Sequence, residues 1–482
     1  MPPSPAPEPA PPASGGMRLA IVVFLLVLAV SLPRRLIPLG FAAGSADDDW
    51  FTLGVNLATF GVFGFGEEAV IYRAPGYPAF VALVLELTVD PSTHSAAAVN
   101  LVGPSAVLLA QSFLLALCAL LLYLWLARRI SAGAAFAAAI VFGTNPYSLV
   151  FAGLIHYDVL NWALLLAFLL VLELAFERRD RSALPAFFLS GLLLTAGVLV
   201  RPVTLLAPLP LLWAFLLRRS GRERFIGYAT LLMGFLLALL PWTARNLALS
   251  GRVIPVHAQG WTAMFASTTD IQSRNPDLYQ WNLVAMGRYM PLYRKITGEN
   301  EIMMTTYARN VVGLEDAARA AALENLGEQP LVYATNFLTA ALSLPSRVNA
   351  VLLTAFVRIQ TREPFDLRWI YAGQPSNLAR GPEALAFQRL HDLLLLAALL
   401  GLCVGLRRGD VFLAVPVALF GAIVLAHALS YLDFYYYAVK MPFLIAFGFY
   451  GIDLLPRAPR YAMIACLLGF SLALTWSMRF FS

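Results

Sequence analysis

Charged side chains are scarce in this sequence of 482 residues. Only 13% of the residues are Asp, Glu, Lys or Arg, whereas 60% are hydrophobic. A soluble globular chain carries roughly 25% charged and 45–50% apolar residues, so a soluble protein of this length could not bury so much apolar surface. The composition excludes a disordered chain, a coiled coil and a cytosolic protein of several domains, and it predicts a protein with many membrane spans.

Cysteine and lysine are also rare. The three cysteines, Cys118, Cys403 and Cys466, lie inside apolar runs and match no zinc or CxxC spacing, which excludes a disulfide-rich secreted module. Lysine occurs only at positions 295 and 440, so nearly every cation is Arg, as is typical of a GC-rich and hence bacterial genome. The net charge of +6 comes mostly from Arg near predicted membrane boundaries, and we therefore expect no nucleic-acid partner.

Long apolar runs dominate the sequence. A membrane-spanning helix needs roughly 20 apolar residues, and on that criterion the sequence predicts about eleven spans. These lie near 18–38, 104–127, 132–151, 157–176, 183–200, 202–217, 225–245, 390–406, 411–430, 434–455 and 460–478. The run 79–89 is too short to cross and is predicted to be a re-entrant or interfacial helix.

The positions of the arginines predict the orientation in the membrane. Arg-rich short connections lie at 128–129, 178–181, 218–224, 407–408 and 457–460. The short connections near 151–156 and 430–434 contain no Lys or Arg. The positive-inside rule places the Arg-rich side in the cytoplasm, so the N-terminus is cytoplasmic and the long segments 39–103 and 248–388 are external. We therefore expect a multi-pass protein of the bacterial inner membrane.

The predicted organisation is an all-α polytopic protein in four parts. They are a disordered Pro/Ala-rich tail (1–17), an N-terminal transmembrane module (18–247) that includes the first external loop (39–103), an external helical domain (248–388) and C-terminal transmembrane helices (389–482). Within the external domain, Leu314–Gly327 has early acidic residues and a terminal Gly followed by Pro330, which predicts an amphipathic helix.

Three adjacent carboxylates, Asp47, Asp48 and Asp49, follow the first span directly. Adjacent carboxylates repel one another, so such a cluster serves a metal, a cationic partner or a proton transfer, or it is a solvated loop. Its place at the predicted outer membrane surface favours a functional role.

A rigid turn, Arg73-Ala74-Pro75-Gly76-Tyr77-Pro78, precedes the short helix at 79–89. Its prolines and glycine fix the backbone and hold Arg73 and Tyr77 at a defined place on the membrane surface. An Arg there can bind a lipid phosphate through charge-assisted hydrogen bonds, and the alternative is an interfacial anchor.

Further polar residues lie at the outer ends of other spans. His156, Tyr157 and Asp158 open the fourth span, where a carboxylate is a functional candidate and helix capping is the alternative for Asp158. Arg201 and Arg245 end two more spans, and Lys440 lies inside the tenth. A buried cation such as Lys440 needs an anion, for which a phosphate is suitable; snorkelling to the interface is the alternative.

The order of these motifs resembles that of the GT-C membrane glycosyltransferases. The resemblance rests on the aspartates after the first span, then RAPGYP (73–78), GLIHYD (153–158), Arg201-Pro202, PWTARN (241–246) and a large external loop, and it covers about residues 18–260. The nearest branch contains the protein O-mannosyltransferases and the aminoarabinose transferases. Beyond residue 260 the agreement is mainly one of topology.

The resemblance implies roles for individual residues. Relatives carry Asp-Glu-x-x-aromatic in the first external loop, so Asp47 takes the catalytic position, to within one residue, and Asp48 the Glu position. Where relatives often carry Ser-Glu, Tyr157-Asp158 keeps a second acid on a shorter side chain. Near the tenth span, Lys440 and Pro442 stand where relatives carry Arg-Tyr before spaced prolines.

The expected function follows from the outward position of these residues. Nucleotide sugars are not expected outside the cytoplasm, and the sequence has no Gly-rich phosphate loop, so the donor is expected to be a polyprenyl-phosphate sugar embedded in the bilayer. The sugar would pass, with inversion, to a hydroxyl of a glycan, lipid or protein acceptor. Asp47 is the expected general base.

The predicted site then has three groups of residues. They are the catalytic Asp47, Asp48 and Asp158, the donor-phosphate ligands Arg73, Tyr77, Arg201 and Lys440, and the acceptor-orienting Asp49, His156, Tyr157 and Arg245. Carboxylates suit Mg²⁺ or Mn²⁺ better than zinc, and a divalent cation held by Asp48 and Asp158 is left open.

Two other functions remain open on the sequence alone. A transporter or flippase of lipid-linked glycans would also have many spans and outward acids, although no internal repeat is evident. A noncatalytic scaffold in an envelope-glycan complex is the second alternative.

Overall fold

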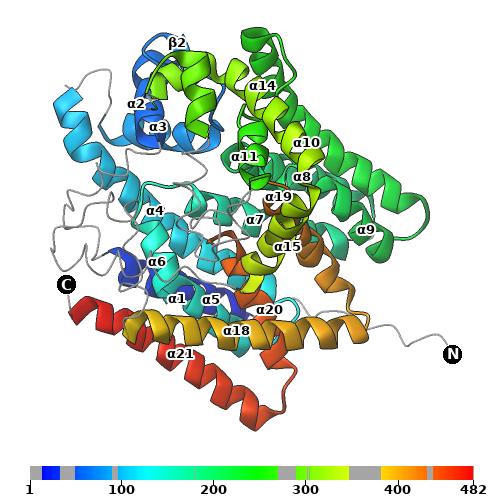
Figure 1. The fold of residues 1–482 in the computed structure, drawn as a ribbon. Helices are drawn as coiled ribbons and strands as arrows, with labels where there is room; N and C mark the ends of the chain where they lie inside the picture. The colour runs from blue at the N-terminus through cyan, green and yellow to red at the C-terminus, as the bar shows by residue number, and fades with distance from the viewer. Residues whose placement is uncertain are drawn as a thin grey trace.

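The computed structural model shows a helical protein whose longest helices form a membrane-sized bundle (Figure 1). The structure describes residues 14–32, 49–89, 96–178, 180–269, 289–300, 302, 304–346, 382–430 and 438–480. Asp47, Asp48 and most of the predicted tail 1–17 lie outside these residues.

Each of the eleven predicted spans overlaps at least one helix of the described residues, but not every one of these helices is long enough to cross a membrane. They are α1 (Ser14–Ser31), α4 (Ala96–Leu126), α5 (Ala132–Thr144), α6 (Pro146–Ala152), α7 (Asp158–Glu177), α8 (Leu184–Val200), α9 (Pro208–Arg218), α10 (Gly221–Ser250), α18 (Pro382–Arg407), α19 (Ala414–Leu429), α20 (Met441–Asp453) and α21 (Arg457–Phe480). Among the described residues, six helices are long and apolar enough to cross a membrane, and α5 with α6 makes a seventh if the bent pair is one span. The predicted all-α, multi-pass membrane fold is confirmed.

Two of the predicted spans are not continuous helices. The segment 132–151 bends by 52° between α5 and α6, where the Asn145 side chain accepts a hydrogen bond from the Ser148 backbone N–H and Pro146 begins the new helix. The segment 202–217 starts with a short 3₁₀ turn (η4, Pro202–Thr204) before α9. Proline supplies no backbone N–H, which explains why both interruptions occur at prolines.

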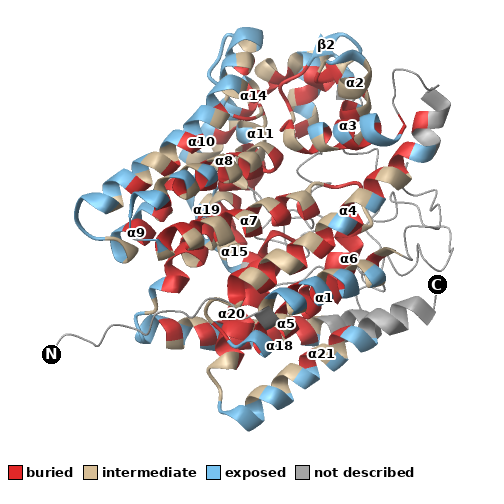
Figure 2. Ribbon diagram, turned by 180° about the vertical axis from the view of Figure 1, so that it is seen from behind, coloured by how far each residue is buried: buried red, intermediate tan, exposed pale blue. Residues whose placement is uncertain are grey.

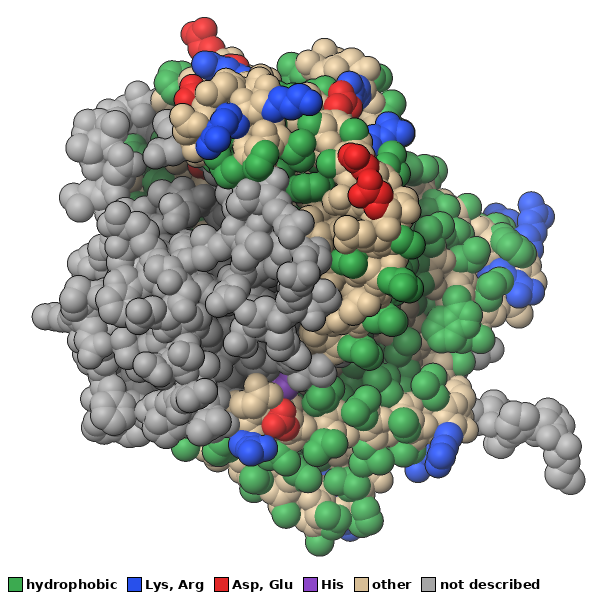
Figure 3. Space-filling view, viewed as in Figure 1, with side chains coloured by type: hydrophobic (Ala, Val, Ile, Leu, Met, Phe, Trp, Pro, Cys, Tyr) green, Lys and Arg blue, Asp and Glu red, His purple; other side chains and the backbone are tan. Residues whose placement is uncertain are grey.

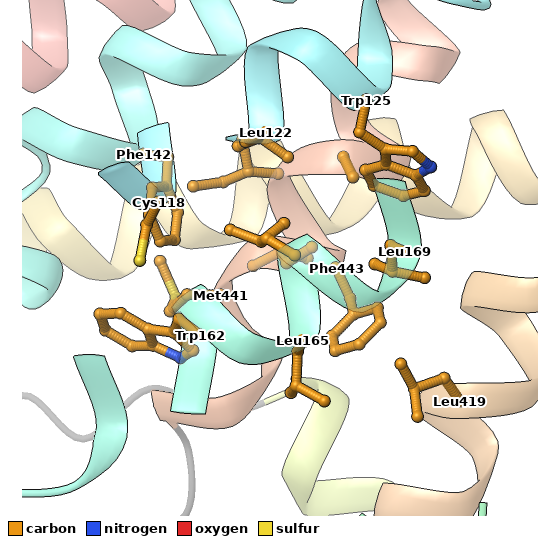
Figure 4. Close-up of a cluster of buried hydrophobic side chains, with 14 of the residues drawn as sticks. Cys118, Leu122, Trp125, Phe142, Trp162, Leu165, Leu169, Leu419, Met441 and Phe443 are labelled. Carbon is orange, nitrogen blue, oxygen red and sulfur yellow. The ribbon is translucent and has the colours of Figure 1, made fainter. Parts of the chain in front are cut away.

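Helix α7 lies at the centre of the bundle (Figure 4). Its Trp162, Leu165 and Leu169 face Cys118, Leu122 and Trp125 of α4, Phe142 of α5, Leu419 of α19, and Met441 and Phe443 of α20. The Trp162 indole N–H donates to the Ala438 carbonyl over 3.1 Å, so the one polar atom of this side chain is satisfied in the apolar interior. This packing holds α7 in a fixed place relative to four other helices.

The two long connections of the sequence fold together. The first contains α2 (Trp50–Phe60), a hairpin of β1 (Gly64–Phe65) with β2 (Glu68–Ala69), and α3 (Gly76–Thr88); the second contains α11 (Gly260–Ser267), α14 (Met304–Glu328) and α15 (Pro330–Ser346). Leu53 and Tyr72 from the first pack with Phe265 and Tyr307 from the second in one apolar cluster. Figure 1 accordingly shows the blue α2 and β2 beside the green α14.

Both helices predicted in these connections are present. The predicted helix Leu314–Gly327 lies within α14, and Pro330 begins α15. The predicted interfacial helix at 79–89 is α3, whose 13 residues are too few to cross a bilayer. The two-stranded hairpin was not expected.

Near its C-terminal end, away from Asp158, α7 carries a second buried acid that is paired with arginines. Glu173 is buried and receives hydrogen bonds from Arg129 of the α4–α5 connection and from Arg218 of α9. Nearby, the guanidinium of Arg128 binds Glu177. These pairs join the Arg-rich connections to one another and compensate the buried carboxylate.

Helix α10 packs on one side and is exposed on the other. Figure 2 shows its exposed face in pale blue along most of its length, and large apolar side chains such as Phe225, Met233 and Leu237 lie on that surface. Such a row suits contact with lipid. Towards α8, by contrast, glycines allow close approach: a Cβ at Gly191 would lie 2.0 Å from the Leu231 carbonyl oxygen.

We predict that Gly191→Ala destabilises the bundle, because α8 and α10 would have to separate to accommodate the methyl group. Overpacking of this kind costs about 1–3 kcal/mol. The matched control is Gly421→Ala in α19, where a Cβ meets nothing within 4 Å and Ala is the better helix former. Thermal unfolding in detergent should show a lower melting temperature for Gly191→Ala alone. Equal melting temperatures for the two variants would contradict the packing described here.

Candidate functional site

Asp49 begins the described part of the first long connection. Its backbone has φ 58°, the one positive φ of a non-glycine residue in the described chain, and it immediately precedes α2. A left-handed conformation is costly for most residues and more accessible to Asp. The Tyr72 hydroxyl donates to Asp49 Oδ2 over 2.7 Å, which ties the start of α2 to the turn that carries Arg73.

Arg73 lies against two aromatic rings. Its guanidinium carbon is 5.0 Å from the centre of the Trp50 ring and 5.4 Å from that of Tyr72. Planar guanidinium groups stack favourably on such faces while keeping their N–H donors available at the edge. The rigid turn predicted from the sequence therefore holds Arg73 beside Asp49.

The titratable neighbours of Arg73, His257 and Tyr72, are both uncharged near pH 7, so Arg73 keeps its positive charge beside two neutral side chains. Burial, and then the positive charge of Arg73, lowers the pKa of His257 to about 4, so this imidazole is neutral near pH 7. Burial and the Asp49 carboxylate raise the pKa of the Tyr72 hydroxyl above its usual range. Tyr72 therefore remains a hydrogen-bond donor to Asp49.

Tyr77 anchors the short helix α3 to the bundle. The side chain is completely buried, and its hydroxyl donates to Gln111 Oε1 over 2.5 Å. The Gln111 amide in turn donates to the carbonyls of Ala152 and Leu154, directly before the His156–Asp158 motif. The structure thus places Tyr77 in the support of the site, whereas the sequence placed it among the phosphate ligands.

A buried ion pair forms the second half of the site. Arg201, which follows α8, donates to Asp158 Oδ1 over 2.5 Å, and the two side chains are 3% and 0% exposed. His156 Nδ1 lies 2.7 Å from the other carboxylate oxygen, and the second guanidinium nitrogen of Arg201 lies 3.4 Å from Nε2 of His427 in α19. His427 Nδ1 faces the Ile423 carbonyl at 2.8 Å, so Nδ1 carries the proton and Nε2 can accept from Arg201.

Tyr157 joins the two halves. Its ring packs edge-to-face on Trp50, with ring centres 5.3 Å apart, and the Arg201 guanidinium lies 5.2 Å from the ring centre. Asp49, Arg73, Tyr157, Asp158 and Arg201 therefore belong to one continuous cluster, although they come from widely separated segments.

Arg245, in the PWTARN motif, binds backbone carbonyls of the first long connection. Its guanidinium donates to the carbonyls of Val70 and Phe63, over 2.8 Å and 3.2 Å, while Asn246 donates to those of Ile254 and Val256. The motif thereby clamps the end of α10 to the backbone of both long connections. The sequence placed Arg245 near the acceptor, and the structure shows it holding the hairpin region that leads to Arg73.

Lys440 lies at the start of α20 and is 1% exposed. It interacts electrostatically with the buried His391 of α18. Lys440 therefore lies at the N-terminal end of α20 and not two turns inside it, and its burial argues against snorkelling; its contact with a donor phosphate stays a prediction.

Three residues of the cluster were not foreseen. No role was assigned to Trp50, Gln111 or His427 from the sequence. A polar side chain within an apolar span costs free energy, so such a residue is a candidate for a functional or structural polar contact. On this criterion the sequence could have identified Gln111 and His427, the latter being one of only five histidines.

The sequence left open a divalent cation held by Asp48, which lies outside the described residues, and Asp158. Within the described part of the chain, no group of three His, Cys, Asp or Glu side chains could hold a metal ion. Asp158 already contacts Arg201 and His156 through its two oxygens, so it is poorly placed to coordinate a cation as well.

Comparison with known proteins gives matches among solved structures alone. No protein-family model and no curated protein sequence matches the chain. The archaeal oligosaccharyltransferase AglB from Archaeoglobus fulgidus matches with a TM-score of 0.53 and 10% identity, over 96% of this chain and 55% of AglB. ArnT from Cupriavidus metallidurans, in its apo state and bound to undecaprenyl phosphate, matches with a TM-score of 0.39 and 15% identity, over 92% of this chain and 78% of ArnT.

The likeness to AglB extends over nearly the whole chain, which itself spans about half the length of AglB. At 10% identity this likeness concerns the fold. The match to AglB shows that this chain shares its fold, in agreement with the polytopic helical architecture that the sequence predicts.

Proposed function

We propose that this protein is a membrane glycosyltransferase that moves a sugar from a polyprenyl-phosphate donor to an acceptor hydroxyl, with inversion at the anomeric carbon. The observation that carries the proposal is the cluster in which Asp49 and Arg73 meet Asp158 and Arg201 through the rings of Trp50 and Tyr157. It combines an acidic segment with two fixed guanidinium groups.

The charges of the cluster suit an anionic donor. Arg73 is stacked on aromatic rings, and Arg201 is held by Asp158 and His427, so both cations are fixed before a ligand binds. Fixed donors stabilise a charge that develops during reaction better than mobile ones do. The AglB structure contains a dolichol-phosphate, and this supports a lipid phosphate as the ligand class for the shared fold.

The proposed reaction is a single displacement. The acceptor hydroxyl oxygen forms a bond to the anomeric carbon, the bond from that carbon to the phosphate oxygen breaks, and the hydroxyl proton passes to Asp47. The polyprenyl phosphate leaves with an additional negative charge, which Arg73 and Arg201 stabilise. The leaving group therefore needs no general acid.

The other residues hold this arrangement in place. The Tyr72–Asp49 hydrogen bond fixes the chain that follows Asp47 and Asp48, and Tyr77 with Gln111 fixes the approach to Asp158. Lys440 is proposed as a further cation for the donor. Because Asp158 is already paired with Arg201, we assign the positive charge at the phosphate to arginine. If a Mg²⁺ or Mn²⁺ ion also binds, its protein ligands would have to come from the acidic segment 47–49.

The Arg-rich connections support a site on the outer side of a bacterial inner membrane, with the N-terminus in the cytoplasm. A polyprenyl donor reaches such a site laterally through the bilayer. AglB is an oligosaccharyltransferase, and we therefore favour the transferase over a flippase.

The first prediction concerns the base. Asp47→Asn should lower the rate of sugar transfer from a synthetic polyprenyl-phosphate donor by about 10²–10⁴-fold, because general-base assistance is worth that much. Asp49→Asn should cost less, since Asp49 keeps an oxygen that can accept from Tyr72. Mass spectrometry of the product measures the rate. Near wild-type turnover of Asp47→Asn would eliminate Asp47 as the base.

The second prediction concerns the donor phosphate. Arg73→Gln should weaken donor use about tenfold or more, as expected for loss of a charge-assisted contact. Arg309→Gln is the control, because this exposed Arg on α14 pairs with Glu68 at the surface. Transfer rates at varied donor concentration separate the two variants. Equal donor dependence in both would remove Arg73 from the phosphate site.

The third prediction concerns the buried ion pair. Asp158→Asn or Arg201→Gln alone should destabilise the protein by about 3–5 kcal/mol, because each leaves one buried charge unpaired. The double variant should lose less than the sum of the two. Unfolding measurements on all four proteins test this coupling. Strict additivity would show that the pair does not act as a unit.

A further inference from the structure

A cavity lies at the Arg-rich end of the bundle, away from the proposed site, and has no part in the proposed reaction. It has a volume of about 360 Å³ and lies between the start of α8 and the start of α10. That volume is within the range of small-molecule and headgroup sites, about 300–1,000 Å³.

The lining of this cavity is divided by polarity. Phe187 and Gly227 are buried on the apolar side, together with the partly exposed Ile226. Four charged residues lie around it: Asp180, Arg181, Arg219 and Glu223. An apolar side combined with a charged side suits an amphipathic ligand.

The surroundings place the cavity at the edge of the bilayer. Leu189 and Phe225 are exposed apolar residues close to it in sequence, and Phe225 lies next to the Arg-rich connection 218–224. Figure 3 shows blue side chains gathered at the turn between α9 and α10, with green apolar side chains beside them. By the positive-inside rule this boundary faces the cytoplasmic leaflet.

The charges around the cavity balance one another, with two cations and two carboxylates. Arg219 is fixed by hydrogen bonds to the carbonyls of Ala175 and Arg178, and Asp180 by the Ser182 backbone and hydroxyl. Arg181 and Glu223 are exposed. The Glu223 carboxylate lies 3.8 Å from the Arg219 guanidinium, so the cavity presents charges of both signs side by side. A headgroup with both a phosphate and a protonated amine can pair with each sign of charge, whereas a purely anionic headgroup can pair with the arginines alone.

We propose that this cavity binds a cytoplasmic-leaflet phospholipid whose headgroup carries a phosphate and a primary amine, as in phosphatidylethanolamine. Arg181 and Arg219 bind the phosphate, Glu223 and Asp180 accept from the ammonium group, and Phe187 and Ile226 contact the start of an acyl chain. Phosphatidylcholine presents no N–H donor and phosphatidylglycerol no cation, so both bind more weakly.

Native mass spectrometry of the delipidated full-length protein tests this proposal. Dioleoyl phosphatidylethanolamine, phosphatidylglycerol and phosphatidylcholine are titrated separately at equal concentrations. The wild-type protein should bind the ethanolamine lipid about fivefold or more tightly than the other two, as loss of one charged contact implies. Equal binding of the three lipids, or preference for phosphatidylglycerol, would overturn the proposal.

Matched variants locate the site. Arg181→Gln should reduce ethanolamine-lipid binding to the level of the other lipids, whereas Arg222→Gln, an exposed Arg of the same boundary outside the cavity lining, should retain the preference. Glu223→Gln should weaken the ethanolamine lipid but not phosphatidylglycerol. Equal losses in Arg181→Gln and Arg222→Gln would show non-specific charge attraction and overturn the assignment.

A steric pair provides an independent measurement. Ile226→Trp should obstruct the cavity and abolish the preference, while Leu236→Trp, at an exposed position further along α10, should leave it intact. Retained preference in Ile226→Trp would contradict binding at this place.

Discussion

The buried ion pair of Asp158 and Arg201 is the constraint on which the rest of the site depends. A charge without a partner in the apolar bundle would cost several kcal/mol, so the start of α7 and the end of α8 must stay together. His427 extends the requirement to α19, because its Nε2 faces the same guanidinium. The three helices are thereby fixed at one end by polar contacts, and Tyr157 is held where it meets Trp50.

A buried acid paired with arginine lies near each end of α7. No charged residue lies between Asp158 and Glu173, and each of these buried acids is bound by Arg from other elements. Apolar packing around Trp162 determines where the helix lies, and the two acids determine which neighbours meet its ends. One end is then joined to the proposed site, while the other lies at the Arg-rich connections, two of whose arginines, Arg181 and Arg219, line the second proposed site.

Much of the fold could be predicted from the sequence, because span length and Arg placement are local signals. The helix within 304–328 and the short helix α3 were also visible in local patterns. The contacts within the site could not be predicted from the sequence in the same way. That Asp158 pairs with Arg201, or that Gln111 receives the Tyr77 hydroxyl, depends on segments 43 and 34 residues apart, and periodicity carries no information on such pairings. Arg245 shows the limit clearly: its motif identified an important residue, but the backbone carbonyls it binds could be found only in three dimensions.

Trp50 explains why these separate elements form one site. Its ring lies against Arg73 and meets both Tyr77 and Tyr157, so a single side chain touches the cation of the first connection, the helix that follows it and the start of α7. Asp49 precedes it with a left-handed backbone that Tyr72 secures. Asp49 and Trp50 can therefore be displaced only if the contacts of Tyr72, Arg73 and Tyr157 change with them. These two neighbouring residues thus couple the first long connection to the start of α7.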